Sequence, residues 1–249
     1  MNNPLSFCTR YDNYGNLIDL LYGEYIWNVE NDPVSIYRRS EGKWKKIFSF
    51  PDHTIQHIHN IVYDKYRNCY FIMTGDKNDE SGIWTADYQF ENVKPLVKGN
   101  QKYRACVLFP TSNGIFYATD TPLEQNYVYK IDNHSIVTEV CKIPGPCIFG
   151  RKCGSSFYFS TSVEGDPRLG KWKYRFSNKL GKGVADRYSH IFRISQEGVV
   201  DELAKIKKDF LPMWFFEFGN IKFPLTEDNN IYICPQSLKA KNGTYILSE

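Results

Sequence analysis

The residues best suited to chemistry are two histidines in the segment QHIHN, His57 and His59. Side chains alternate along a β-strand, so histidines two positions apart place both rings on one face. Such a pair can bind a metal ion or transfer protons. An aspartate, Asp76, ends the next apolar segment in MTGD. The pattern predicts acid–base chemistry by an imidazole and a carboxylate; the plainer alternative is a hydrogen-bonded pair without function.

Other polar residues interrupt the apolar segments where one segment ends or the next begins. Arg104 in QKYRA offers a guanidinium that suits a carboxylate or sugar hydroxyls, although it could also be a structural anchor. An acidic residue at a strand end is often only a turn former. The candidate catalytic residues are His57, His59, Asp76, Asp120 and Glu164, and the candidate substrate-binding residues are Glu24, Gln101, Arg104, Thr121, Asn126, Thr161, Trp214 and Glu217.

The segments that carry these residues have the composition of β-strands. Aromatic residues make up 16% of the chain, with 18 Tyr and 17 Phe, and aromatic residues favour strands. Segments such as CYFIMTG, GIFYAT and SFYFST are short, apolar or alternating, and bounded by Gly, Asn or Asp. Only DELAKIKKDF, residues 201–210, also fits a helix. The sequence therefore predicts an all-β fold.

An apolar pair recurs along the chain and reveals an internal repeat. Its first members lie 47, 45, 63 and 54 residues apart, close to the length of a β-propeller blade. We therefore expect a single β-propeller domain over residues 1–249, with five four-stranded antiparallel blades or, alternatively, six. The fifth unit lacks an obvious fourth strand, so it is either three-stranded or completed by a segment near the amino terminus. The pairs are Ile36-Tyr37, Ile83-Trp84, Val128-Tyr129, Ile191-Phe192 and Tyr245-Ile246.

This repeat predicts where the polar residues meet. In each blade the second strand runs antiparallel to the first, so its end lies beside the start of the first strand. All such positions share one mouth of the central channel. We expect this mouth to be lined by His57, His59, Asp76, Arg104, Asp120 and Glu164.

Composition excludes several classes of function. The 31 basic and 28 acidic residues leave a net charge of +3, too weak to predict nucleic-acid binding. No apolar stretch is long enough for membrane insertion, and the first residues lack a signal-peptide pattern, so we expect a cytoplasmic protein.

The seven cysteines form no C-x-x-C pair, and we expect them to be unpaired. We expect no cofactor; a divalent metal at His57 and His59 is the minor alternative.

Seven ordered segments carry a resemblance over residues 20–247: GEY, HIHNIVYD, TGD, QKYRA, TDTP with NYVYKID, STSVEG and FEFG. They resemble the sialidase-like (BNR-repeat-like) β-propeller proteins often encoded among bacterial and archaeal polysaccharide-biosynthesis genes. The sequence box of sialidase repeats, Ser-x-Asp-x-Gly-x-Thr-Trp, is degenerate here. The segment SEGKW, residues 40–44, keeps the Ser, Gly and Trp of this box, and TADYQFEN, residues 85–92, keeps only the Asp. The Arg-Ile-Pro signature of true sialidases is absent, which disfavours sialidase activity.

The sequence supports two main functions. One is an enzyme that acts on a glycan or sugar-derived small molecule, as a glycoside hydrolase or a lyase, with a histidine as base or acid and a carboxylate as its complement. Gln101, Arg104 and Asn126 would then anchor the substrate. The other is a non-catalytic propeller that binds glycans or proteins.

Overall fold

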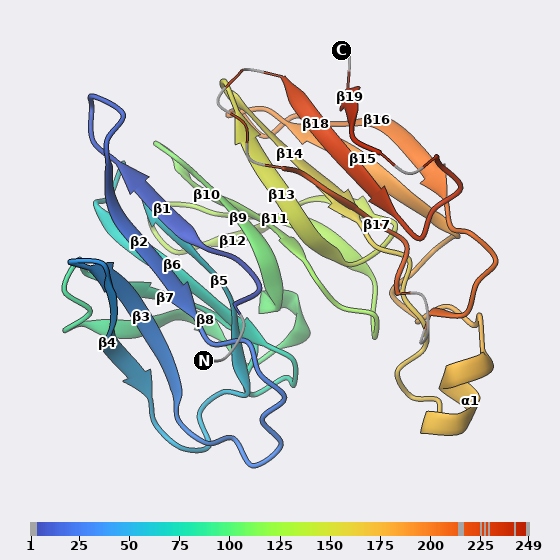
Figure 1. Cartoon of the computed structure of the whole chain (residues 1–249), viewed down its shortest axis with the longest axis horizontal. Coiled ribbons are helices and arrows are strands. Elements are labelled where there is room, and N and C mark those ends of the chain that lie inside the picture. Colours follow the sequence, from blue (N-terminus) through green and yellow to red (C-terminus); the bar gives the residue numbers. More distant parts are fainter. Residues whose placement is uncertain are drawn as a thin grey trace. The chain divides into compact units, whose positions relative to one another are not determined.

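The computed structural model describes residues 4–213, 217–224, 226, 228, 230–241 and 243–247. Antiparallel strands form five sheets, and in each sheet neighbours along the chain are neighbours in space (Figure 1). The chain divides into two compact units, residues 1–112 and 113–249. The predicted all-β class is confirmed, whereas a single domain over the whole chain stays a prediction.

Two complete sheets lie in the first unit. Each is a four-stranded meander in which hairpins join consecutive strands. A 3-10 turn, Gln101–Tyr103, leads into a further strand, β9 (Ala105–Thr111). The strands of the two sheets are β1 (Cys8–Tyr11), β2 (Leu17–Gly23), β3 (Val34–Ser40) and β4 (Lys43–Phe50), and β5 (His57–Asp64), β6 (Cys69–Gly75), β7 (Gly82–Ala86) and β8 (Val93–Lys98).

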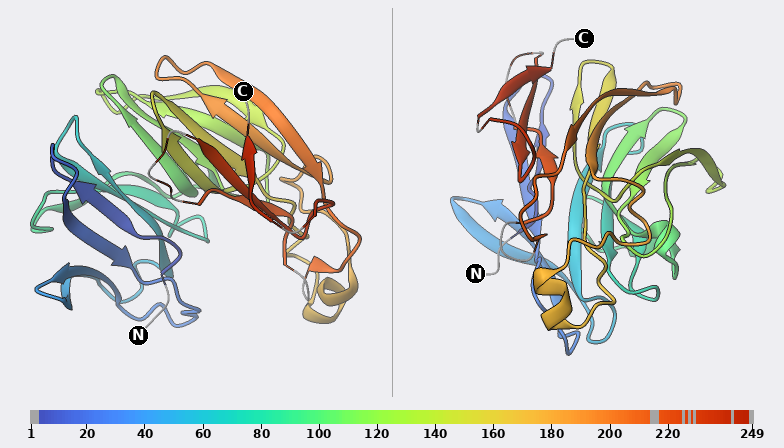
Figure 2. Two further views of the ribbon diagram at one scale, coloured as in Figure 1. Left: turned by 45° about the horizontal axis from the view of Figure 1, so that its top comes forward. Right: turned by 90° about the vertical axis from the view of Figure 1, so that its right-hand side faces the viewer.

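The remaining strands follow the same order. The third sheet contains β9 and three strands beyond residue 112, the fourth has four strands, and the fifth has three among the described residues, as the missing fourth strand predicts. A short helix, α1 (Lys171–Phe176), lies in the long connection between β14 (Ser156–Thr161) and β15 (Tyr188–Ile194) (Figures 1 and 2). These strands are β10 (Gly114–Thr119), β11 (Asn126–Ile131) and β12 (Val137–Ile143); β13 (Cys147–Cys153), β14 (Ser156–Thr161), β15 (Tyr188–Ile194) and β16 (Val200–Lys207); and β17 (Asn220–Lys222), β18 (Ile231–Gln236) and β19 (Tyr245–Leu247).

The recurring apolar pair has a structural cause. In four sheets the register between the third and fourth strands shifts within this pair, as between Ile36 and Tyr37. Each shift leaves one aliphatic residue of the fourth strand without an opposite partner, which is a β-bulge. The first member of these four pairs is fully buried, at no more than 1% exposure, whereas Tyr245 of the fifth pair is 37% exposed. The unpartnered residues are Ile47, Leu96, Val140 and Leu203.

The segment that fits both a helix and a strand is mainly a strand in the structure. The helix-compatible segment 201–210 is mainly strand β16, because Leu203, Ala204 and Ile206 pack on the core around Ile191 and this packing outweighs local helix propensity. The helix α1 is six residues long. No described helix could cross a membrane. All seven cysteines are free, as predicted.

Candidate functional site

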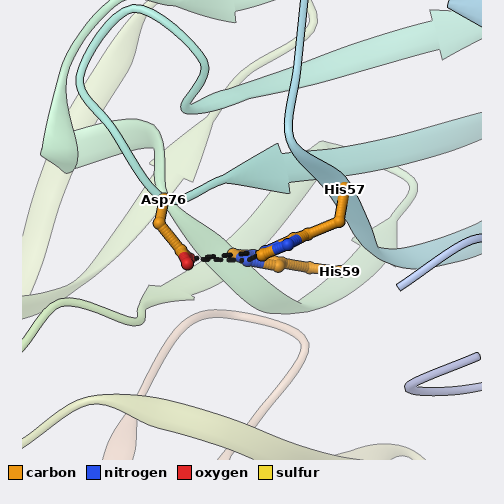
Figure 3. A group of neighbouring side chains, drawn as sticks. All are labelled: His57, His59 and Asp76. Carbon is orange, nitrogen blue, oxygen red and sulfur yellow. Dashed lines mark hydrogen bonds and ion pairs between the residues drawn. The ribbon is translucent and has the colours of Figure 1, made fainter. Parts of the chain in front are cut away.

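A β-bulge in the second sheet positions the two histidines. His57 opposes Gly75, Ile58 opposes Thr74, and the next partner of β6, Met73, opposes Asn60, so His59 has no opposite residue. Bulges redirect side chains, often beside functional sites. Asp76 directly follows β6, and its carboxylate and both imidazoles point to one place (Figure 3).

Two imidazole nitrogens and one carboxylate oxygen meet at this place, and we call the three side chains the His57–His59–Asp76 cluster. The two Nε2 atoms lie 3.1 Å apart, and His59 Nε2 lies 3.1 Å from Asp76 Oδ1. His57 Nε2 lies 3.5 Å from the same oxygen. The imidazoles are 5% and 2% exposed, whereas the Asp76 side chain is 37% exposed. The cluster is therefore open only on its carboxylate side.

Backbone carbonyls fix the orientation of both rings. His57 Nδ1 lies 3.3 Å from the oxygen of Ile26, and His59 Nδ1 lies 3.0 Å from that of Ala105. A carbonyl oxygen can only accept, so each Nδ1 carries the proton. In a neutral ring, Nε2 then has a free lone pair that points into the cluster.

Asp76 is held by cationic and amide groups of the segment before β9. Arg104 Nη2 lies 3.0 Å from Asp76 Oδ1, and Gln101 Nε2 donates to the Asp76 carbonyl at 2.7 Å. Burial raises the pKa of Asp76, but His57 and His59, which donate to the carboxylate when Nε2 carries a proton, and the charge of Arg104 outweigh burial and hold this pKa well below its usual range. The carboxylate is therefore charged at neutral pH.

Glycine is required beside the cluster. A Cβ atom at Gly75 would lie 2.6 Å from His59 Cε1 and 3.3 Å from Arg104 Cγ. The absence of a side chain therefore leaves the space that the His59 ring occupies.

Two exposed aromatic residues flank the carbonyl that orients His57. Tyr25 and Trp27 lie on either side of Ile26 in the connection between β2 and β3, and they are 38% and 88% exposed. The ring centroids of Tyr25 and His57 are 4.4 Å apart. Aromatic faces of this kind can stack on apolar ligand surfaces. Tyr25 thus places an aromatic ring next to the charged cluster, and Trp27 is a further exposed aromatic residue of the same connection.

Other predicted site residues of the first unit have structural roles. Glu24 is 8% exposed, and its carboxylate accepts hydrogen bonds from the Ser35 backbone and the Tyr37 hydroxyl. Both oxygens therefore hold β3, and a contact of Glu24 with substrate stays a prediction. Gln101 and Arg104, in contrast, contact Asp76 and belong to the surroundings of the cluster.

In the second unit Asn126 and Thr161 are also held by hydrogen bonds within the fold. Asn126 is fully buried, and its amide binds the backbone of Thr121 and Gly183, so it holds a loop; its role as a substrate anchor stays a prediction. Thr161 is buried and accepts a hydrogen bond from the His190 backbone. Thr121 is equally buried, and its hydroxyl accepts from the Leu123 backbone.

The acidic candidates of the second unit keep an open role. Asp120 is buried, and Glu164 is buried and accepts a 2.5 Å hydrogen bond from Ser162. That they share a mouth with His57, His59, Asp76 and Arg104 stays a prediction. Glu217 is exposed with φ of 65°, and Trp214 lies outside the described residues.

Residues that could hold a metal ion are present in the first unit. His57, His59 and Asp76 together offer two imidazole nitrogens and a carboxylate oxygen within reach of one ion. Tyr25 and Gly75 also contact the cluster, and the sequence analysis missed them. The Gly-Asp pair at the end of CYFIMTGD was the available signal for Gly75; no periodic pattern marks the segment of Tyr25.

Comparisons with known proteins support the fold. No protein-family model matches the chain, and no curated protein matches its sequence. TolB from Acinetobacter baumannii is similar in structure, with a TM-score of 0.51, 14% identity, and coverage of 97% of this chain and 55% of that chain. The chain thus spans about half the length of TolB.

Two further solved structures show the same likeness. The β-propeller domain of the trilobed protease from Pyrococcus furiosus has a TM-score of 0.53 and 10% identity over 97% of this chain and 67% of that chain. A putative gluconolactonase has a TM-score of 0.54 and 8% identity over 99% and 77%. These neighbours are β-propellers, so the predicted propeller fold is confirmed, with five sheets as its blades. The sialidase-like resemblance and the link to polysaccharide biosynthesis stay predictions.

Proposed function

We propose that this propeller is an enzyme that acts on an acidic glycan at the His57–His59–Asp76 cluster. The observation that carries the proposal is the convergence of two buried imidazoles and one charged, partly exposed carboxylate within 3.5 Å. Burying so many ionisable groups together costs stability, and such groups often mark functional sites. The neighbouring Tyr25 and Trp27 would stack on the apolar faces of sugar rings.

Elimination fits this geometry better than glycoside hydrolysis. Hydrolysis by the common mechanism needs two carboxyl groups on either side of the bond. Among the described residues of the first unit, only Asp76 brings a carboxylate into the cluster, because Glu24 is bound to β3. Elimination needs a base at one ring carbon and a positive charge beside the sugar carboxylate. The cluster supplies lone pairs for the first role, and Arg104 supplies the charge for the second.

The reaction would proceed without an oxidant or reductant. A base removes the proton from the ring carbon next to the carboxylate, a carbon–carbon double bond forms, and the neighbouring carbon–oxygen bond breaks. The departing sugar oxygen takes a proton from the site. Arg104 would neutralise the charge that develops on the carboxylate group.

A panel of uronate-containing and neutral oligosaccharides tests the proposal. We expect ultraviolet absorbance from the new double bond with uronate substrates only. Asp76→Asn and Arg104→Ala should each lower kcat/KM by about 100-fold or more, with thermal stability changed by no more than about 1 kcal/mol. Arg39→Ala, at an exposed arginine of β3, is the matched control and should keep full activity.

Three outcomes would contradict the proposal in different ways. New reducing ends without the double bond would replace elimination by hydrolysis. Binding of the oligosaccharides without any turnover would favour the non-catalytic glycan-binding propeller. Neither binding nor turnover across the panel would reject an acidic glycan as the ligand.

A further inference from the structure

We propose that His57, His59 and Asp76 bind a divalent transition-metal ion of the Zn²⁺ class. The inference starts from the ring orientations. Both Nδ1 atoms face backbone carbonyl oxygens, so both Nε2 atoms turn lone pairs toward each other and toward a carboxylate. Three electron-rich atoms at such distances repel one another unless a positive charge lies between them. Either a proton or a metal ion can provide it.

The separations of the three atoms fit a metal ion. Zinc binds imidazole nitrogen and carboxylate oxygen at about 2.0–2.2 Å in tetrahedral sites, which places neighbouring ligand atoms about 3.3 Å apart. The observed separations are 3.1, 3.1 and 3.5 Å. The three atoms therefore form one face of such a tetrahedron. A single proton on one nitrogen would relieve at most the two contacts of that atom and leave the third.

The arrangement is that of a site with an open position. Three protein ligands leave the fourth corner of the tetrahedron to water or substrate, as in catalytic rather than structural zinc sites. Only the carboxylate side is accessible, since Asp76 is 37% exposed and the imidazoles are buried. The open corner would therefore face the solvent side of the cluster, where a substrate enters.

The surroundings support the ligands as metal sites require. Each of the two histidines donates a hydrogen bond from Nδ1 to a backbone carbonyl, which is the usual support of a metal-binding histidine in proteins. The bulge at His59 and the space at Gly75 fix the second ring. Gln101 donates a hydrogen bond to the backbone carbonyl of Asp76 and so helps to hold this residue in place.

Arg104 is the one feature that opposes a cation. Its Nη2 atom lies 3.0 Å from Asp76 Oδ1. A carboxylate oxygen has more than one lone-pair direction, so it can accept from a guanidinium and bind an ion together. The positive charge lowers the affinity for the ion, and it leaves two cationic groups beside the open corner. This combination suits an anionic ligand atom of the substrate.

The inference deepens the proposed function and rests on it only for the role of the ion. A bound ion would take up the imidazole lone pairs and add positive charge beside the sugar carboxylate. The base would then be a water molecule at the open corner, whose pKa the ion lowers. Binding of the ion itself does not depend on the glycan.

Direct metal binding tests the inference. The full chain is stripped with a chelator and titrated with ZnCl₂ by calorimetry, and elemental analysis counts the bound ions. We expect one Zn²⁺ per chain, and with Co²⁺ the visible absorption bands of a tetrahedral site. His59→Ala and Asp76→Asn should each weaken binding by 100-fold or more, while His134→Ala, at an exposed histidine, should leave it unchanged.

The outcomes separate the two proposals. Stripped wild-type protein that binds no Zn²⁺, Co²⁺ or Mn²⁺, or variants that bind as tightly as wild type, would overturn the metal site. Asp76→Asn keeps the size of the side chain, so it tests the site even if His59→Ala fails to fold. Metal binding without turnover of any glycan would reject the proposed function and leave the metal site standing. Turnover that a chelator does not change would do the reverse.

Discussion

Two buried histidine sites, one in each unit, differ in what their rings contact. In the second unit His190 lies between two carboxylates: Nδ1 is 3.0 Å from Glu202, and Nε2 is 3.1 Å from Asp186. Both nitrogens of His190 thus face acceptors on the protein. In the first unit, each ring of the His57–His59–Asp76 cluster also has one nitrogen on a backbone carbonyl, but the two other nitrogens face each other and share a single carboxylate oxygen, Asp76 Oδ1.

This difference separates a satisfied site from an open one. His190 needs nothing from outside the fold, because both ring nitrogens can donate to carboxylate oxygens. In the cluster, two imidazole nitrogens share one carboxylate oxygen and face each other, so the two rings do not each have a separate acceptor for Nε2. A buried histidine with nearby carboxylates is thus not by itself a functional site. The partner of each nitrogen decides the role.

The largest expected effect that tests this comparison is on stability. With a chelator present, His190→Ala should lower the free energy of unfolding by about 3 kcal/mol, because it removes a buried ring together with its two hydrogen bonds. His59→Ala should cost only about 1 kcal/mol, since loss of a ring is offset by relief of lone-pair repulsion. Urea denaturation measures both values.

His134→Ala, at an exposed position, gives the baseline for this experiment. Equal losses for His190→Ala and His59→Ala would break the comparison, because the cluster would then be as satisfied as the His190 site. A larger loss for His59→Ala would mean that the cluster stabilises the fold rather than serving a ligand.

A second, smaller effect concerns the space at Gly75. Gly75→Ala brings a Cβ to 2.6 Å from His59 Cε1, so the ring must shift. We expect Zn²⁺ affinity to fall by about tenfold, the size of effect seen when support of a ligand is disturbed. Gly170→Ala, where a Cβ meets nothing within 4 Å, is the matched control. Unchanged affinity in Gly75→Ala would show that His59 is not held as a ligand.

The sequence predicted the members of the cluster because their placement depends on local pairing. His57, His59 and Asp76 come from two consecutive strands, and antiparallel pairing brings the start of one beside the end of the next. Arg104 joins them from the segment directly before the following strand. Grouping of this kind needs only the strand pattern and the repeat.

What the sequence could not predict depends on hydrogen bonds between distant segments. The carbonyls of Ile26 and Ala105, which orient the rings, are backbone groups and leave no residue-type signal. Asn126 looked like a substrate anchor, yet its amide holds a loop to Gly183, far along the chain. The two carbonyl partners of Nδ1 direct both Nε2 atoms into the cluster, and this orientation is what favours a metal ion. The strand β16 likewise depends on packing against β15 rather than on its own propensity.

The smallest expected effect concerns a buried group that is neutral rather than charged, Cys8 of β1. It is 5% exposed, and burial raises the pKa of its thiol to about 12. An unfolded thiol loses its proton from about pH 8.5 upward, while the folded one keeps it until about pH 12. Ionisation therefore stabilises the unfolded chain first. The free energy of unfolding should fall as pH rises through this interval.

We expect Cys8 to account for about 1 kcal/mol of the stability lost between pH 8 and pH 9.5. Cys8→Ala should flatten the pH dependence by this amount, and its stability relative to wild type at pH 7 gives the baseline for lost packing. Urea denaturation at several pH values measures both. A slope identical to wild type would mean that the Cys8 thiol ionises equally in the folded and unfolded chain. Burial alone would then not keep the Cys8 thiol of the first unit neutral.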